Sequence, residues 1–130
     1  MRPHRNIVPR GRPHRKLDVW NEAMDLVVTL YEITGAFPKT EKYALADQLR
    51  RAAVSIPSNI AEGAARQTKK EFVQFLHIAQ GSASEIDTQL EVAHRLNYIS
   101  DEAKREVDAR LDAIGRMLTG LIRSVRGRES

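Results

Sequence analysis

Apolar residues recur every three or four positions along most of this 130-residue chain, and this spacing predicts four helices. The first helix is expected over residues 17–34, because Gly35 and then Pro38 follow it, as is usual at helix ends. Most of its polar residues form one narrow stripe, and almost everything else is apolar; the stripe consists of Asp18, Glu22, Asp25, Thr29 and Glu32. An outer helix of a monomeric bundle should be about half polar, so this helix predicts a subunit interface as well as a core.

The second helix is expected to begin near residues 41–43, with Thr40 as its N-cap. Its inner stripe consists of Leu45, Leu49, Ala52, Ile56 and Ile60. Pro57 interrupts this helix, and Gly63 ends or loosens it. A proline inside a helix costs about 3 kcal/mol, because it lacks the N–H that would bond the carbonyl of Ala53. We therefore expect a kink at Pro57, with the backbone repaired by nearby polar side chains: Ser55, Ser58 and Asn59.

The third helix should begin at a capping box that Thr68 and Glu71 form. Its apolar stripe is Phe72, Leu76, Ala79, Ala83, Ile86, Leu90 and Ala93, and Asn97 suits its C-terminal end. The fourth helix is capped by Ser100 and carries Val107, Leu111, Ile114, Leu118, Leu121 and Val125. No segment alternates with the period of two that strands require. The chain is therefore expected to be an all-α, up-down four-helix bundle.

The positive charge is concentrated at the two ends of the chain. Residues 1–16 contain no acid and several basic residues, namely Arg2, Arg5, Arg10, Arg12, Arg15 and Lys16. Prolines and a glycine punctuate this segment, which predicts a disordered basic tail before a bundle over residues 17–126. A second basic cluster, Arg123, Arg126 and Arg128, runs into a C-terminal tail at 127–130. Both clusters are candidates for binding nucleic-acid phosphates, and the alternative for residues 1–16 is a solvated leader without function.

Candidate catalytic and metal-binding groups are few. The chain has no cysteine, which excludes disulfides and thiolate metal sites, and it has no phosphate-binding glycine loop or hydrolase motif. Glu91 and His94 form one Glu-x-x-His pair, whereas di-iron bundles need two pairs and two more glutamates. His77 lies on an ordinary polar face. We therefore expect a cytoplasmic protein without enzymatic activity, cofactor, metal or membrane-spanning segment.

One block carries the most specific information about the family. It runs from Arg50 and Arg51 through Ile56-Pro57-Ser58-Asn59-Ile60 to Glu62 and Gly63, and it is supported by Phe72-x-x-Phe75-Leu76 and Gly81-Ser82. With these residues, about residues 17–100 closely resemble the four-helix bundle proteins of the 23S rRNA intervening-sequence family. The resemblance implies a homopentamer with no known enzymatic activity. It also implies distant similarity to the accessory proteins of diversity-generating retroelements, pentameric barrels that bind nucleic acid and a reverse transcriptase.

Two functions are compatible with these features. The first is a non-enzymatic, oligomeric helical bundle, homopentameric by resemblance, that binds the backbone of RNA or DNA through its basic termini. The second is a scaffold that docks a partner protein such as a polymerase and binds no nucleic acid. In either case the small residues around Pro57 and in Ala79–Ser84 predict a close contact between the second and third helices, in which Leu at Ala52 or Ala83 would be disruptive.

Overall fold

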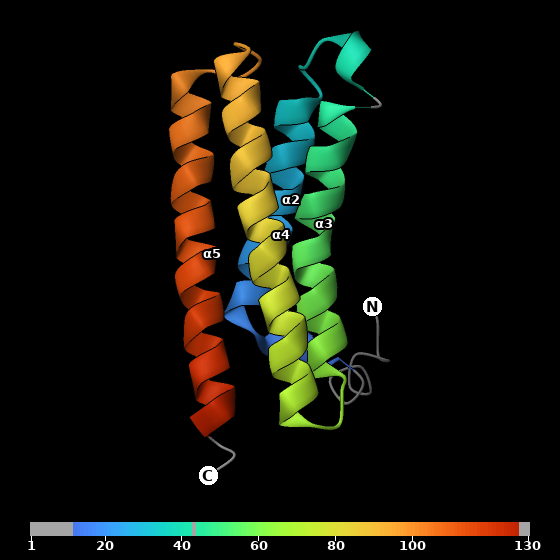
Figure 1. Cartoon of the computed structure of the whole chain (residues 1–130), viewed down its shortest axis with the longest axis vertical. Helices are drawn as coiled ribbons and strands as arrows, with labels where there is room; N and C mark the ends of the chain where they lie inside the picture. The colour runs from blue at the N-terminus through green and yellow to red at the C-terminus, as the bar shows by residue number, and fades with distance from the viewer. Residues whose placement is uncertain (1–11, 43, 128–130) are drawn as a thin grey trace, which may run out of the picture.

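The structure is a computed structural model that describes residues 12–42 and 44–127. Four long helices run alternately up and down: α2 (Asp18–Thr34), α3 (Leu45–Ala64), α4 (Lys69–Arg95) and α5 (Asp101–Gly127) (Figure 1). Two short 3₁₀ helices, η2 (Pro13–Lys16) and η3 (Lys39–Glu41), precede α2 and α3. The described residues contain no strand. The predicted all-α four-helix bundle is therefore confirmed.

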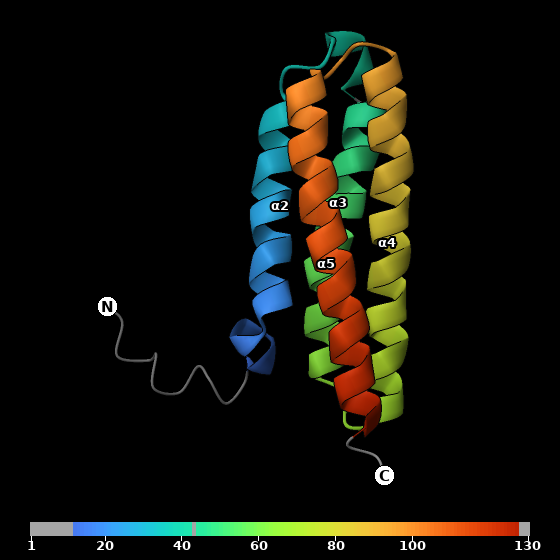
Figure 2. The same cartoon turned by 90° about the vertical axis from the view of Figure 1, so that its left-hand side faces the viewer.

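The four helices enclose one hydrophobic core. Figure 2 shows α5 flanked by α2 and α4, with α3 behind it, so each helix has two close neighbours. The apolar stripes predicted from the sequence point inward, and the largest fully buried side chains come from all four helices: Leu26, Leu30, Leu49, Ile56, Ile60, Leu76, Ile86, Leu90, Ile114 and Leu118. Near the end of α5 the predicted stripe is off by one residue: Ile122 is buried, whereas Leu121 is half-buried at the edge of the core.

Among the described residues, secondary structure begins before the boundary expected at residue 17. The segment Pro13–Lys16 forms η2, which packs against α2 and α3. The rings of His14 and Trp20 lie 5.0 Å apart, and the Arg15 guanidinium lies 5.6 Å from the Trp20 ring. This packing holds part of the predicted disordered tail against the bundle. Residues 1–11 of that tail lie outside the described residues.

The predicted start of the second helix was wrong. Thr40 does not cap it, because residues 39–41 form η3, and α3 begins only at Leu45. Glu41 serves the helix start instead: its Oε1 accepts a hydrogen bond of 3.4 Å from the Leu45 N–H. The Tyr98 hydroxyl donates to Glu41 Oε2 at 2.9 Å and holds that carboxylate in place. The signal was missed because Tyr98 comes from the distant α4–α5 turn.

The backbone repair predicted around Pro57 was also wrong. The helix α3 continues through Pro57, which is buried, and the bend expected there stays a prediction. Asn59 Nδ2 donates to the Ser55 carbonyl at 2.8 Å and to Ser55 Oγ at 3.0 Å, so it does not serve the Ala53 carbonyl. Ser55 Oγ also lies 2.7 Å from Ser82 Oγ on α4. These polar side chains therefore link α3 to α4. The helices can approach closely at this point because Ser55 and Ser82 are both small.

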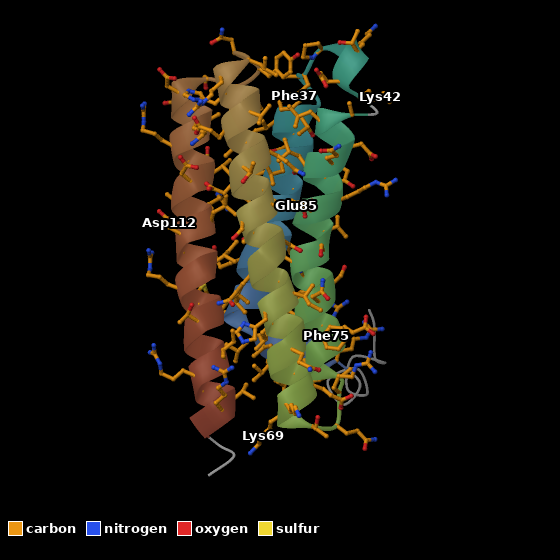
Figure 3. All side chains as sticks on the ribbon, in the orientation of Figure 1. Phe37, Lys42, Lys69, Phe75, Glu85 and Asp112 are labelled. Carbon is orange, nitrogen blue, oxygen red and sulfur yellow. The ribbon has the colours of Figure 1, made fainter. Side chains whose placement is uncertain are left out.

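The predicted close contact between α3 and α4 occurs at Ser55 and Ser82, and the two helices also approach closely near their connecting turn. A Cβ atom added to Gly63 would lie 2.8 Å from Phe75 Cβ and 3.2 Å from the Phe72 carbonyl oxygen. Figure 3 labels Phe75 where α4 runs beside the lower part of α3. Ala52 is buried, as predicted, but Ala83 lines a groove toward α5, so the expectation that it faces α3 was wrong.

The predicted helix ends on α4 and α5 are confirmed. Thr68 Oγ1 accepts from the Glu71 N–H at 3.1 Å and donates to the Glu71 carboxylate at 3.0 Å. Asn97 has a φ of 65°, which allows the Tyr98 N–H to bond the Ala93 carbonyl at 2.9 Å. This left-handed residue ends α4 in a Schellman motif. Ser100 Oγ then accepts from the N–H three residues on at 3.1 Å, which begins α5.

Candidate nucleic-acid interface

The described parts of the two basic segments, residues 12–16 and the end of α5 with Arg123 and Arg126, lie at the same end of the bundle, although they are far apart in sequence. Because the helices alternate in direction, the start of α2, the α3–α4 turn and the end of α5 lie together (Figure 1). Lys69 is labelled at this end, near the C-terminus, in Figure 3. We call it the basic end and define it by its described cations: Arg12, Arg15, Lys16, Arg66, Lys69, Lys70, Arg123 and Arg126. Fewer acids lie there: Asp18, Glu22, Glu62 and Glu71.

The structure describes only some of the residues that the sequence predicts to bind phosphate. Arg12, Arg15, Lys16, Arg123 and Arg126 are all at the basic end. Arg12 and Arg15 flank His14, and burial together with the positive charges of Arg15 and Arg12 lowers the pKa of the His14 imidazole. These neighbouring cations therefore disfavour the protonated form of His14. The remaining candidates lie outside the described residues: Arg2, Arg5, Arg10 and Arg128.

The Glu-x-x-His pair lies near the other end of the bundle, within a group of ion pairs. Glu91 pairs with Arg95 at 2.8 Å and with Lys104 at 3.2 Å, and these hydrogen bonds lower the pKa of its carboxyl. His94 Nε2 lies 2.6 Å from the Asp101 carboxylate, whose pKa this contact lowers. Throughout residues 12–42 and 44–127, no three His, Asp or Glu side chains are grouped to hold a metal ion. Glu91 and His94 are therefore members of ion pairs on the surface of the bundle.

A groove separates α4 from α5 on the surface, because small residues line it: Ala83 and Ser84 on α4, and Gly115 and Gly120 on α5. This α4–α5 groove has a volume of about 800 Å³ and also contains two carboxylates, Asp87 and Asp112. Toward the basic end it continues into a second hollow of about 490 Å³. We call this hollow the basic pocket; it is lined by His77, Gln80, Thr119, Ile122, Arg123, Arg126 and Gly127.

A chain of hydrogen bonds crosses the basic pocket. Arg126 donates to His77 Nε2 at 3.3 Å, and His77 Nδ1 lies 2.9 Å from Gln80 Oε1. Gln80 Nε2 then donates to Thr119 Oγ1 at 3.3 Å. Sequence reasoning missed this group, because it placed His77 on an ordinary polar face. A signal was available: the chain has no acid over residues 72–84 or 113–127.

Apolar side chains remain exposed on two separate surfaces. The first, the α2–α3 apolar face, consists of the exposed Met24, Val28, Tyr31 and Val54 together with the half-buried Trp20 and Val27. Part of it lines a groove of about 290 Å³. Val28 is 57% exposed, so the predicted burial of this helix around most of its circumference does not occur within one chain. The second, the α4 apolar stripe, consists of Ile78, Val92 and Leu96. Exposed residues of α3 lie between the two surfaces, namely Arg51, Ser58 and Glu62.

The residues of the family block have structural contacts. Arg50 donates to Thr34 Oγ1 at 2.7 Å and to the Tyr31 carbonyl at 3.1 Å, so a side chain of α3 binds the C-terminal end of α2. Arg51 pairs with Asp47 at 3.0 Å. The other members form the Asn59 and Gly63 contacts described above, the Glu62–Arg66 ion pair at 2.9 Å, and the groove walls at Pro57 and Ser58. The block therefore holds α2, α3 and α4 together.

Residues 15–120 match the sequence profile of the 23S rRNA-intervening sequence proteins. The chain belongs to this family. Among solved structures, it is similar to a protein of unknown function from the S23 ribosomal protein family of Bacteroides thetaiotaomicron VPI-5482. The TM-score is 0.75 at 24% identity, covering 81% of this chain and 95% of the other. No curated protein matches the chain.

The match confirms the resemblance drawn from the block around Pro57, and it supports the fold. Neither the family description nor the solved neighbour names a reaction. Within the part of the chain that the structure describes, none of the helices combines the length and apolarity needed to cross a bilayer.

Proposed function

We propose that this 23S rRNA-intervening sequence protein is a non-enzymatic bundle that assembles with copies of itself into a ring and binds the backbone of RNA or DNA through its basic end. One observation carries the proposal: two apolar surfaces stay exposed on different helices. Burying the exposed part of each such side chain would stabilise an assembly by roughly 0.5–1.5 kcal/mol. A ring of five subunits is the size that the family resemblance implies.

A second copy of this chain is the occupant that fits these surfaces best. A two-fold dimer needs one self-complementary surface, whereas a ring needs two different surfaces that fit each other. The charges beside the two surfaces are complementary. Glu85 lies midway along the α4 apolar stripe, and Arg51 lies one turn from Val54 of the α2–α3 apolar face. Packing one surface on the other would bring these opposite charges toward each other.

Ring symmetry would multiply the basic end. Rotation about one axis places the same end of every subunit on the same rim. Several basic ends on one rim would bind a phosphate backbone with a much higher effective concentration than a single copy. Each phosphate that is neutralised releases counterions, so the affinity should fall by orders of magnitude between about 50 and 200 mM salt.

The test of assembly is a pair of substitutions that add the same charge at different places. Val28→Asp on the α2–α3 apolar face should lower the mass measured by light scattering to that of smaller species. Ala109→Asp, at an exposed position of α5 outside both surfaces, should leave the mass unchanged. Equal masses for both variants and the unsubstituted protein would refute the assigned interface.

The nucleic-acid part has its own test, which also separates the two functions. A filter-binding titration with single-stranded RNA and DNA at several salt concentrations should give salt-dependent affinity, reduced when residues 1–16 are deleted. A protein that assembles but shows no affinity even at low salt would instead favour the scaffold that docks a partner protein.

A further inference from the structure

The hydrogen bonds of the basic pocket select one tautomer of the neutral His77 imidazole. Arginine can only donate, so His77 Nε2, 3.3 Å from Arg126, is the acceptor in this hydrogen bond. The proton of the neutral imidazole is then on Nδ1, which donates to Gln80 Oε1 at 2.9 Å. The amide of Gln80 is thereby oriented so that its NH₂ group donates to Thr119.

It follows that each acceptor atom of these pocket side chains already accepts one hydrogen bond, while several N–H and O–H donors stay available. His77 Nε2, Gln80 Oε1 and Thr119 Oγ1 each accept a hydrogen bond from a neighbour. The Thr119 hydroxyl proton and most N–H groups of Arg123 and Arg126 are left to donate. A ligand that brings only acceptor oxygens would complement this arrangement.

The arginines of the pocket also differ from four other arginines of the chain. Arg51, Arg66, Arg95 and Arg110 each pair with a carboxylate four residues earlier. The residues four positions before Arg123 and Arg126 are Thr119 and Ile122, and neither arginine forms an ion pair with any carboxylate in the described ranges. The nearest acid along α5, Asp112, precedes Thr119 by two turns, about 10 Å along the helix.

We propose that the basic pocket binds a phosphate group, with Arg123 and Arg126 as its charge partners and the Thr119 hydroxyl as a further donor. Arginine is suited to this role because its planar fork binds two oxygens of one phosphate. The His77 imidazole, which accepts from Arg126, keeps that guanidinium turned into the pocket. The 490 Å³ volume lies in the range of small-molecule sites, which leaves room for whatever carries the phosphate.

This proposal deepens the nucleic-acid part of the proposed function and rests on it only for the source of the phosphate. A backbone phosphate of RNA or DNA and a free phosphate or small phosphate ester would present the same oxygens. Ring assembly is not required, because every lining residue comes from α4 and α5 of one chain.

The first arm of the experiment uses inorganic phosphate and follows the imidazole signals of the full chain by NMR. We expect a saturable shift of the His77 signal that chloride at equal ionic strength does not produce, while His94 near the other end stays unshifted. Arg126→Gln or Arg123→Gln should weaken the affinity roughly tenfold to a hundredfold, since each removes a charged hydrogen bond. Arg105→Gln, an exposed position near the start of α5, is the matched control and should change nothing.

The second arm uses a single-stranded oligonucleotide and identifies the source. A His77 shift that inorganic phosphate reverses would support the pocket as an entry point for the backbone. Saturation by phosphate without any oligonucleotide binding would support the pocket but refute the nucleic-acid function. The oligonucleotide could instead bind without shifting the His77 signal and with an affinity that Arg126→Gln does not change. That result would refute phosphate binding in the basic pocket but leave the nucleic-acid function standing. A linear response to phosphate, equal to that of chloride, would overturn the proposal outright.

Discussion

Gly63→Ala tests the packing on which the bundle depends. The added methyl carbon would lie 2.8 Å from Phe75 Cβ, 2.9 Å from Phe72 Cδ1 and 3.2 Å from the Phe72 carbonyl oxygen. Two of these atoms are held by the α4 backbone, so α3 and α4 must separate. Overpacking of this kind costs about 1–3 kcal/mol, offset by the 0.5–1 kcal/mol that alanine gains over glycine in a helix. These figures span a net loss of about 0–2.5 kcal/mol, and contacts as short as 2.8 Å place the expected loss at about 1–2 kcal/mol.

Urea denaturation at one fixed protein concentration measures this loss. With an m-value of about 2 kcal/mol/M, the midpoint should fall by roughly 0.5–1 M. Gly120→Ala is the matched control, because a Cβ at Gly120 would meet no atom within 4 Å. It should raise the midpoint through helix propensity alone. If Gly63→Ala also raised the midpoint, the close approach of α3 to α4 at this residue would be wrong.

Three further predictions concern the core and the charged surface. A double-mutant cycle of Ser55→Ala and Ser82→Ala should give a coupling of about 1 kcal/mol in urea denaturation, and strictly additive losses would contradict their hydrogen bond. Ala52→Leu should destabilise by about 1–3 kcal/mol, because Ala52 is only 4% exposed; an unchanged midpoint would argue against tight packing there. His94 lowers the pKa of Asp101, so this carboxyl stabilises the fold above about pH 4 and loses that effect as the pH falls through its folded pKa. Asp101→Asn should therefore flatten part of the stability loss in an acid titration, and an identical acid profile would refute the contribution.

The helices could be predicted because each must bury one face. The stripes from Leu49 to Ile60 and from Leu76 to Ala93 repeat at three and four residues, and only a helix turns such a repeat toward one core. Local caps were equally accessible: Thr68 and Asn97 act within one turn of their own position. Short-range physical rules were therefore sufficient for the fold class and for most of the helix ends.

Contacts between distant segments could not be predicted in the same way. Tyr98 binds the Glu41 carboxylate from 57 residues away along the chain, and Glu41, rather than Thr40, accepts from the N–H of Leu45 at the start of α3. Ser55 bonds Ser82 because the helices approach closely, which local rules around Pro57 do not contain.

The candidate site illustrates the same division. The basic residues were evident from composition, but their gathering at one end follows from the alternating helix directions. The link between His77 and Arg126 needed the pairing of α4 with α5. The sequence signal for this link was an absence: the segments of α4 and α5 that line the basic pocket contain no acidic residue.

The mass of the full-length protein in solution tests the central claim most directly. Light scattering at micromolar concentration should give a multiple of the 14.7 kDa chain mass, five times that mass for the ring that the family resemblance implies. Such a value would support the proposed assembly, whose interface the Val28→Asp and Ala109→Asp variants then assign. A mass of one chain that persists as the concentration is raised would contradict the proposed assembly.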